Sequence, residues 1–142
     1  MKKNYIKFLA IIAILSFGNL NAQTEIATEV IIINGEAYGT NASNIASYDL
    51  ITKTYEVFDT IGSNSIQDVL IEGTTAFVAA QSIIVSYDLE TKTRIADVAF
   101  PGVSSNYESI FVDDNYVFVG NAYGQTDSNL YAFDKNTLAF EF

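Results

Sequence analysis

One eight-residue phrase occurs twice in this chain and constrains its fold more than any other feature. Residues 47–54 read SYDLITKT, and residues 86–93 read SYDLETKT. A weaker copy, AFDKNT, stands at 132–137, after a somewhat longer interval. Self-similarity at a spacing near forty residues is typical of stacked or radial repeats. The chain is therefore predicted to consist of three similar units.

Each unit reads as short strands separated by turn residues. The β-branched run 29–33 meets Asn34-Gly35, a strong hairpin signal because these residues tolerate the positive φ of a type I′ turn. The expected strands are 29–33, 36–39, 44–48 and 54–58, then 66–71, 75–80, 83–87 and 94–100, then 107–112, 116–120, 129–133 and 138–142. We expect an all-β fold of about three four-stranded antiparallel sheets, the blades of an incomplete β-propeller, at residues 29–60, 66–101 and 107–142.

The N-terminal segment 1–22 has the layout of a cleaved secretory signal peptide. A basic start is followed by an apolar run of about ten residues over 8–17, and Ala22 precedes the expected cut. A retained anchor is the alternative, but a membrane span needs about twenty apolar residues. Residues 23–142 are therefore expected to be exported to the periplasm, the cell surface or the medium, with no membrane span.

Composition narrows the chemistry available to the exported part. Without Lys2, Lys3 and Lys7, four of the seven basic residues remain beside 17 acidic ones, for a net charge of −13. A surface this acidic repels phosphate backbones and argues against nucleic acid as a partner. The chain has no Cys and no His, which removes disulfides, the usual nucleophile pairs and the common zinc ligand sets. We expect no catalytic residues, no metal site and no cofactor.

Two stretches carry a resemblance to a known family. Residues 68–79 resemble the first two strands of a YVTN-type (YncE-like) propeller blade, and residues 84–91 resemble its third strand and turn. The copy at 130–134 is also similar to quinoprotein-like blades. The hallmark Tyr-Val-Thr-Asn itself is replaced by Phe-Val-Ala-Ala at 77–80 and Phe-Val-Gly-Asn at 118–121. The resemblance covers nearly all of the mature chain and implies a bacterial propeller, exported or surface-located.

Three blades are too few for a closed ring, since propellers have about four to eight. The flanks of the first and third units would then expose apolar faces and strand edges. Two completions are open. These residues are an N-terminal portion of a longer polypeptide, or blades from two or more chains complete one ring.

The recurring Asp49, Asp88 and Asp134 have a structural and a functional interpretation. As a carboxylate set they could carry chemistry, but each belongs to the same turn of a different blade, so turn capping explains them better. The oxygen-rich stretches 113–115 and 127–129 contain Ca²⁺-type ligands without the spacing of a dedicated calcium loop. We interpret both stretches as solvated turns.

The long loop of the third unit is the candidate contact surface. It contains Tyr123, Gln125, Thr126 and Asp127, and loops carry function on rigid scaffolds. An ordinary insertion is the competing interpretation. The first functional hypothesis is a non-catalytic module that binds a protein or a glycan at the cell envelope. The second is a fragment of a quinoprotein-like oxidoreductase whose cofactor site lies in blades absent here.

Overall fold

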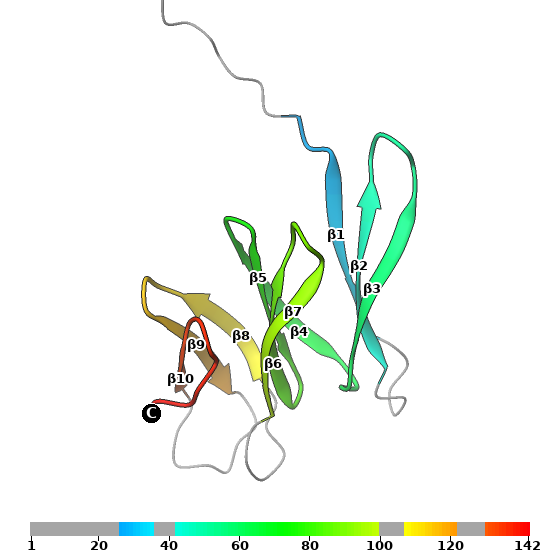
Figure 1. The fold of residues 1–142 in the computed structure, drawn as a ribbon. Helices are drawn as coiled ribbons and strands as arrows, with labels where there is room; N and C mark the ends of the chain where they lie inside the picture. Colours follow the sequence, from blue (N-terminus) through cyan, green and yellow to red (C-terminus); the bar gives the residue numbers. More distant parts are fainter. Residues whose placement is uncertain (1–25, 36–41, 100–106, 122–129) are drawn as a thin grey trace, which may run out of the picture.

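The computed structural model of the chain describes residues 26–35, 42–99, 107–121 and 130–142, and these residues form three antiparallel β-sheets without a helix (Figure 1). The first sheet contains β1 (Glu29–Asn34), β2 (Ser43–Asp49) and β3 (Tyr55–Ile61). The second contains β4 (Ile66–Glu72), β5 (Thr75–Ala80), β6 (Ile83–Asp88) and β7 (Thr93–Ala99). The third contains β8 (Tyr107–Val112), β9 (Tyr116–Asn121) and β10 (Leu130–Asp134). The fold is all-β and consists of propeller blades in an incomplete ring.

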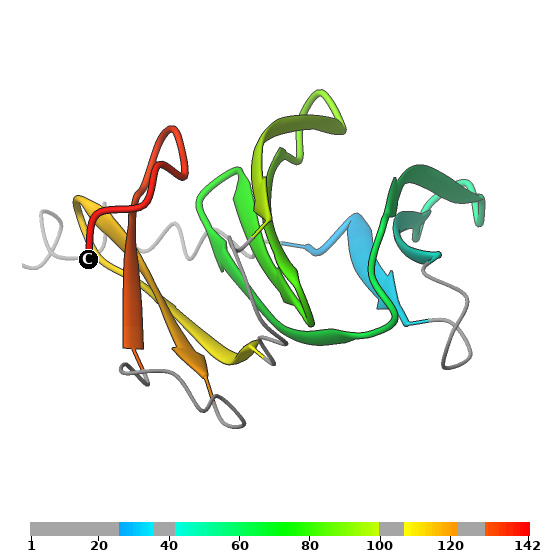
Figure 2. The ribbon, with the colours of Figure 1, turned by 90° about the horizontal axis from the view of Figure 1, so that it is seen from below.

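The second sheet lies between the other two, and its central strands β5 and β6 are buried on both faces (Figure 2). Successive residues of a strand point to opposite faces, so β5 serves two cores. Ala76 and Val78 pack toward the first sheet, with Ile45, Ile61 and other residues of one cluster. Phe77 packs toward the third sheet, in the cluster that contains Phe133. This double burial explains why β5 reads as a continuous apolar run rather than an alternating one.

The second and third sheets have the same irregularity of strand pairing. Each has an irregularity early in its first strand, between Ile66 and Asp68 in β4 and between Tyr107 and Ser109 in β8. The last residues of the chain run beside β10, where Phe140 forms a bridge with Phe133. The segment 139–142 thus begins the fourth strand expected for the third sheet.

The first sheet departs from the expected strand order. The hairpin predicted at Asn34-Gly35 placed residues 36–39 between the first strand and the strand that begins near residue 44. That order is wrong, because β1 pairs directly with β2, with Ile31 opposite Ser47. The residues 36–41 lie outside the described part of the chain. In register, β1 takes the place that β5 has in the second sheet, where Phe77 lies opposite Ser86.

This pairing leaves part of the second sheet uncovered. Among the described residues, no strand lies beside β1 in the place that β4 has beside β5. Val69 and Ile71, on the face of β4 that turns toward the first sheet, are 40% and 49% exposed. The equivalent of Val69 in the third sheet is Ile110, which packs against the second sheet and is only 8% exposed.

Candidate functional site

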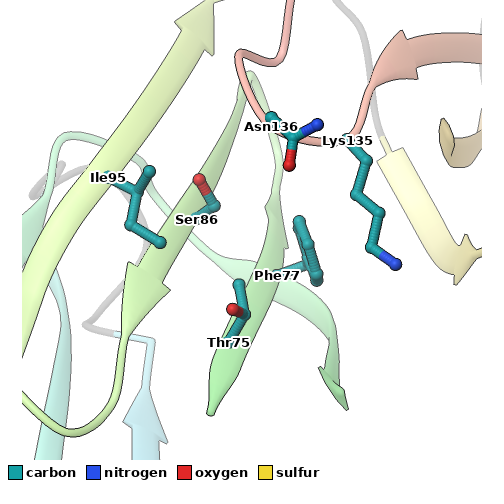
Figure 3. Close-up of a pocket in the computed structure, with 6 residues that line it drawn as sticks. All are labelled: Thr75, Phe77, Ser86, Ile95, Lys135 and Asn136. Atoms are coloured by element: carbon teal, nitrogen blue, oxygen red, sulfur yellow. The ribbon is translucent and has the colours of Figure 1, made fainter. Parts of the chain in front are cut away.

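A small pocket opens at the junction between the second and third sheets (Figure 3). Its lining comes from β5, β6, β7 and the turn after β10, namely Thr75, Phe77, Ser86, Ile95, Lys135 and Asn136. It encloses about 100 Å³. Pockets that bury a drug-sized ligand enclose roughly 300–1,000 Å³. The pocket therefore has room for a few water molecules or the tip of one side chain.

An ammonium group fills the corresponding position at the junction between the first and second sheets. Lys92 Nζ lies 2.9 Å from Glu29 Oε1 and 3.2 Å from Glu56 Oε2. It also donates a hydrogen bond of 2.8 Å to Ser47 Oγ. The hydrogen bond from Lys92 lowers the pKa of Glu29, and the same bond raises the pKa of Lys92. The group is a charged clamp between two sheets.

The two junctions correspond residue by residue. Glu29 corresponds to Thr75, because each lies opposite the turn aspartate of its sheet, Asp49 or Asp88. By the 39-residue repeat, Ser47 corresponds to Ser86 and Glu56 to Ile95. Lys92 and Leu138 each stand four residues after the turn aspartate, with φ of 56° and 55°. At the second junction Leu138 thus replaces the lysine, while Thr75 and Ile95 replace the two glutamates. The pocket is what remains where that clamp is missing.

A second polar cluster joins the first and second sheets. Asp59 Oδ2 accepts hydrogen bonds of 2.8 Å from both Tyr87 Oη and Arg94 Nε. Arg94 Nη2 lies 2.6 Å from the same oxygen and donates to the carbonyl of Thr60 at 3.0 Å. Burial, together with the bond to Asp59, raises the pKa of Tyr87 well above its ordinary value. One carboxylate thus holds a phenol and a guanidinium from the neighbouring sheet.

Lys135 joins the third sheet to the second. Its Nζ lies 2.6 Å from Glu72 Oε2 and donates to the carbonyl of Asp113 at 2.9 Å. Lys92, Arg94 and Lys135 are three of the four basic residues that follow residue 22, and all three span sheets or turns in this way. The fourth is Lys53, which is exposed.

The three turn aspartates have matching surroundings, each in its own sheet. Asp49 Oδ1 accepts the backbone N–H groups of Thr52 and Ile51, and Asp88 Oδ1 accepts those of Thr91 and Glu90. These bonds lower the pKa of both carboxyls. Asp134 Oδ1 accepts hydrogen bonds from the hydroxyl of Thr137 and from the backbone N–H groups of Thr137 and Asn136. These bonds, that of the hydroxyl first, again lower the pKa of the carboxyl. Each carboxylate closes its own turn.

Asp113 acts in the same local manner. Its Oδ1 accepts the backbone N–H groups of Asn115 and Tyr116, at 2.8 and 2.7 Å, and these bonds lower its pKa. Within the described ranges, no three Asp, Glu, His or Cys side chains gather as they would around a metal ion. The other oxygen-rich stretch, 127–129, lies outside the described ranges, which resume at residue 130.

The proposed contact loop also falls outside the described residues. Tyr123, Gln125, Thr126 and Asp127 all belong to the segment 122–129. The junction residues Asp59, Arg94 and Lys135 were not singled out from the sequence, since the partner of each belongs to another sheet. One signal was available. With four basic residues beside 17 acidic ones after residue 22, most basic side chains are expected to lie near carboxylates.

The described part of the chain contains no helix that is long and apolar enough to cross a membrane. Comparison with known proteins finds no similar sequence. No family model matches the chain, and no curated protein matches it.

Proposed function

We propose that this chain is an exported β-propeller module that works by binding, as a scaffold at the cell envelope or surface, and not by catalysis. The observation that supports the proposal most is that the basic side chains at the junctions are paired with carboxylates. Lys92, Arg94 and Lys135 are paired with carboxylates of the neighbouring sheets, so these groups stabilise the row of sheets. A stiff row of sheets is suited to presenting loops, which is how rigid β scaffolds bind other molecules.

The sequence supplies the other supports. The leader at residues 1–22 favours export, and the resemblance to YVTN-type blades favours a bacterial surface or periplasmic protein. The loop that contains Tyr123 and Asp127 is the proposed contact, because tyrosine with small polar neighbours suits an adaptable binding surface. The partner is a protein or a glycan of the envelope.

The test begins with the exported protein recovered from cells. Mass spectrometry should place its first residue at Gln23, and fractionation should place it outside the cytoplasm. The protein is then applied to a glycan array and, in parallel, cross-linked in intact cells to identify a bound protein. Retention on a glycan or a reproducible protein partner supports the proposal. A tightly bound chromophore with turnover of a redox dye overturns it.

Two variants locate the contact. Tyr123→Ala should weaken binding about tenfold or more, as expected for an aromatic residue at the centre of an interface. Asn136→Ala is the matched control, because Asn136 is an exposed residue at the rim of the small pocket. If Asn136→Ala abolishes binding and Tyr123→Ala leaves it intact, the pocket and not the loop is the contact.

A further inference from the structure

The packing of the three sheets has a direction. Each sheet has one face turned toward the preceding sheet, its N-side face, and one turned toward the following sheet, its C-side face. Ala76 and Val78 form the N-side face of β5, and their equivalents Val117 and Val119 form that of β9, packed on the second sheet. Phe77 lies on the C-side face of the second sheet. Both junctions therefore join a C-side face to an N-side face.

Among the described residues no other sheet covers the C-side face of the third sheet, and Phe142 alone packs on part of it, with its ring 6.2 Å from that of Tyr116. Its cross-strand row Phe111, Phe118, Ala132 repeats the row Leu70, Phe77, Ser86 of the second sheet. Phe77 is buried beneath the third sheet, whereas Phe111 is 61% exposed. The Phe118 ring lies 6.1 Å from that of Phe111 and 6.0 Å from that of Tyr116, measured between ring centroids. An aromatic surface of this kind is a mark of an interaction site.

The N-side face of the first sheet is also open among those residues. Val30, Tyr55 and Val57 lie on the face opposite to the core residue Ile45 and are 43%, 53% and 46% exposed. On the equivalent face of the second sheet the central strands β5 and β6 are covered, with Ala76 and Tyr87 fully buried. The chain thus carries both halves of a third junction, one at each end of the row (Figure 2).

The charges at the two ends are complementary as well. Lys53 stands four residues after Asp49 with φ of 61°, in the position and the conformation of Lys92. Glu141 stands seven residues after Asp134, as Glu56 stands seven residues after Asp49, and its backbone N–H donates to the carbonyl of Ala132, the repeat equivalent of Ser47. Lys92 binds Glu56 within the chain. The equivalent pair, Lys53 and Glu141, lies exposed at opposite ends of the row.

We propose that a second copy of this chain covers these faces, with the N-side face of its first sheet on the C-side face of the third sheet and its Lys53 paired with Glu141. Two copies related by a twofold axis form two such junctions and six sheets in all. Six lies within the range of about four to eight at which propellers close. The contact joins unlike faces, and the ring closes it so that no filament grows.

The test uses the exported chain as purified, with half of the sample labelled with ¹⁵N. A carbodiimide couples a lysine amine to a carboxylate only when the two are in contact. The expected product is a Lys53–Glu141 cross-link that joins labelled to unlabelled chains, in a particle with the mass of two chains by light scattering. The cross-links Lys92–Glu56 and Lys135–Glu72 serve as internal controls, because both pairs lie within the chain.

Charge reversal separates this contact from nonspecific association. Lys53→Glu and Glu141→Lys should each weaken self-association about tenfold or more, because each places like charges together. The double variant should restore the affinity to within about threefold of the original, because the pair is then rebuilt with its charges exchanged. Glu90→Lys, a reversal at an exposed turn residue of the second sheet, is the control and should leave the affinity unchanged.

The opposite results are equally clear. A particle of one-chain mass at every concentration, with the internal cross-links formed and Lys53–Glu141 absent, overturns the proposal. The occupant of the two faces is then a further sheet of the same polypeptide or another protein. A dimer that all three reversals leave unchanged also overturns it.

Discussion

Tyr87 donates a hydrogen bond of 2.8 Å to Asp59, and that bond crosses from the second sheet to the first. Arg94 binds the same carboxylate oxygen, and its guanidinium lies 5.9 Å from the centre of the Tyr87 ring. The Phe58 ring of the first sheet packs against the Tyr87 ring in a T-shaped arrangement, at 5.9 Å between centroids. The junction therefore depends on a small group of polar and aromatic side chains in mutual contact.

Removal of the phenol should weaken this junction. Tyr87→Phe keeps the ring but takes away one hydrogen bond to a charged acceptor, which should lower the free energy of unfolding by about 1.5–3 kcal/mol. Tyr48→Phe is the control, because Tyr48 holds the same place in the first copy of the repeated phrase, on the uncovered face of the first sheet. Urea unfolding of the two variants checks the prediction. Equal losses in both would show that the bond to Asp59 contributes nothing.

Acid should destabilise the fold through its turns. The pKa values of Asp49, Asp88, Asp113 and Asp134 are lowered in the folded chain. Their contribution to stability is therefore present above the unfolded pKa of about 4 and is lost as the pH falls through the lowered folded value. The urea midpoint should fall steeply below about pH 4, the range in which these carboxylates take up protons.

A substitution at one turn tests the cause of that acid loss. Asp88→Asn keeps a side-chain oxygen that can accept the turn N–H groups but has no charge to lose. It should lower stability at neutral pH, since bonds to a carboxylate are stronger, and should flatten the acid part of the curve. Glu90→Gln removes the same charge two residues later and should keep the original slope. Parallel curves for Asp88→Asn and the unsubstituted chain would contradict the prediction.

Phe77 and Phe118 occupy the same position in neighbouring sheets but differ in burial. Phe77→Ala should cost about 3–5 kcal/mol, because it opens a cavity in the core between the second and third sheets. Phe118 is half-buried on an uncovered face, so Phe118→Ala should cost less in dilute solution. Chemical unfolding at several protein concentrations checks both values. A cost for Phe118→Ala that grows with protein concentration would indicate that a second copy covers that face.

The partner of β1 can be tested by introduced cysteines, since the chain has none of its own. Ile31 lies opposite Ser47, so Ile31→Cys with Ser47→Cys should form a disulfide. The sequence repeat instead aligns Tyr38 with Phe77, which would place residue 38 opposite Ser47. Tyr38→Cys with Ser47→Cys should therefore stay reduced. Gel mobility without reductant distinguishes the two, and the reverse outcome would show that the repeat and not the observed register is right.

Local chemistry explains what the sequence could predict. Short β-branched and aromatic runs, with turn residues at regular intervals, predicted the all-β fold and its sheets. The bonds at Asp49 and Asp88 involve residues only two and three positions away, so the repeated phrase itself contains them. The position of β1 was not predicted. Either 29–33 or 36–39 could pair with the edge of β2, and the local sequence does not decide between them.

The junction contacts could not be predicted for a related reason. Lys92 binds Glu29, which stands in a different unit, and the two meet only when their sheets pack. The same repeat position holds Leu138 in the third unit. The repeat pattern does not distinguish a lysine from a leucine at this turn position. The lysine forms a charged clamp at one junction, whereas a pocket lies at the other, where the leucine stands.

The regular succession of unlike faces also bears on how such a chain can evolve. A row built this way has a polarity, like a strand or a helix, because each junction joins the same two kinds of face. Duplication of the coding sequence for one unit would add a sheet whose two sides already match its new neighbours. Length can therefore change in whole units while each junction keeps the same pairing of faces, and individual units are left free to diverge on their outer edges.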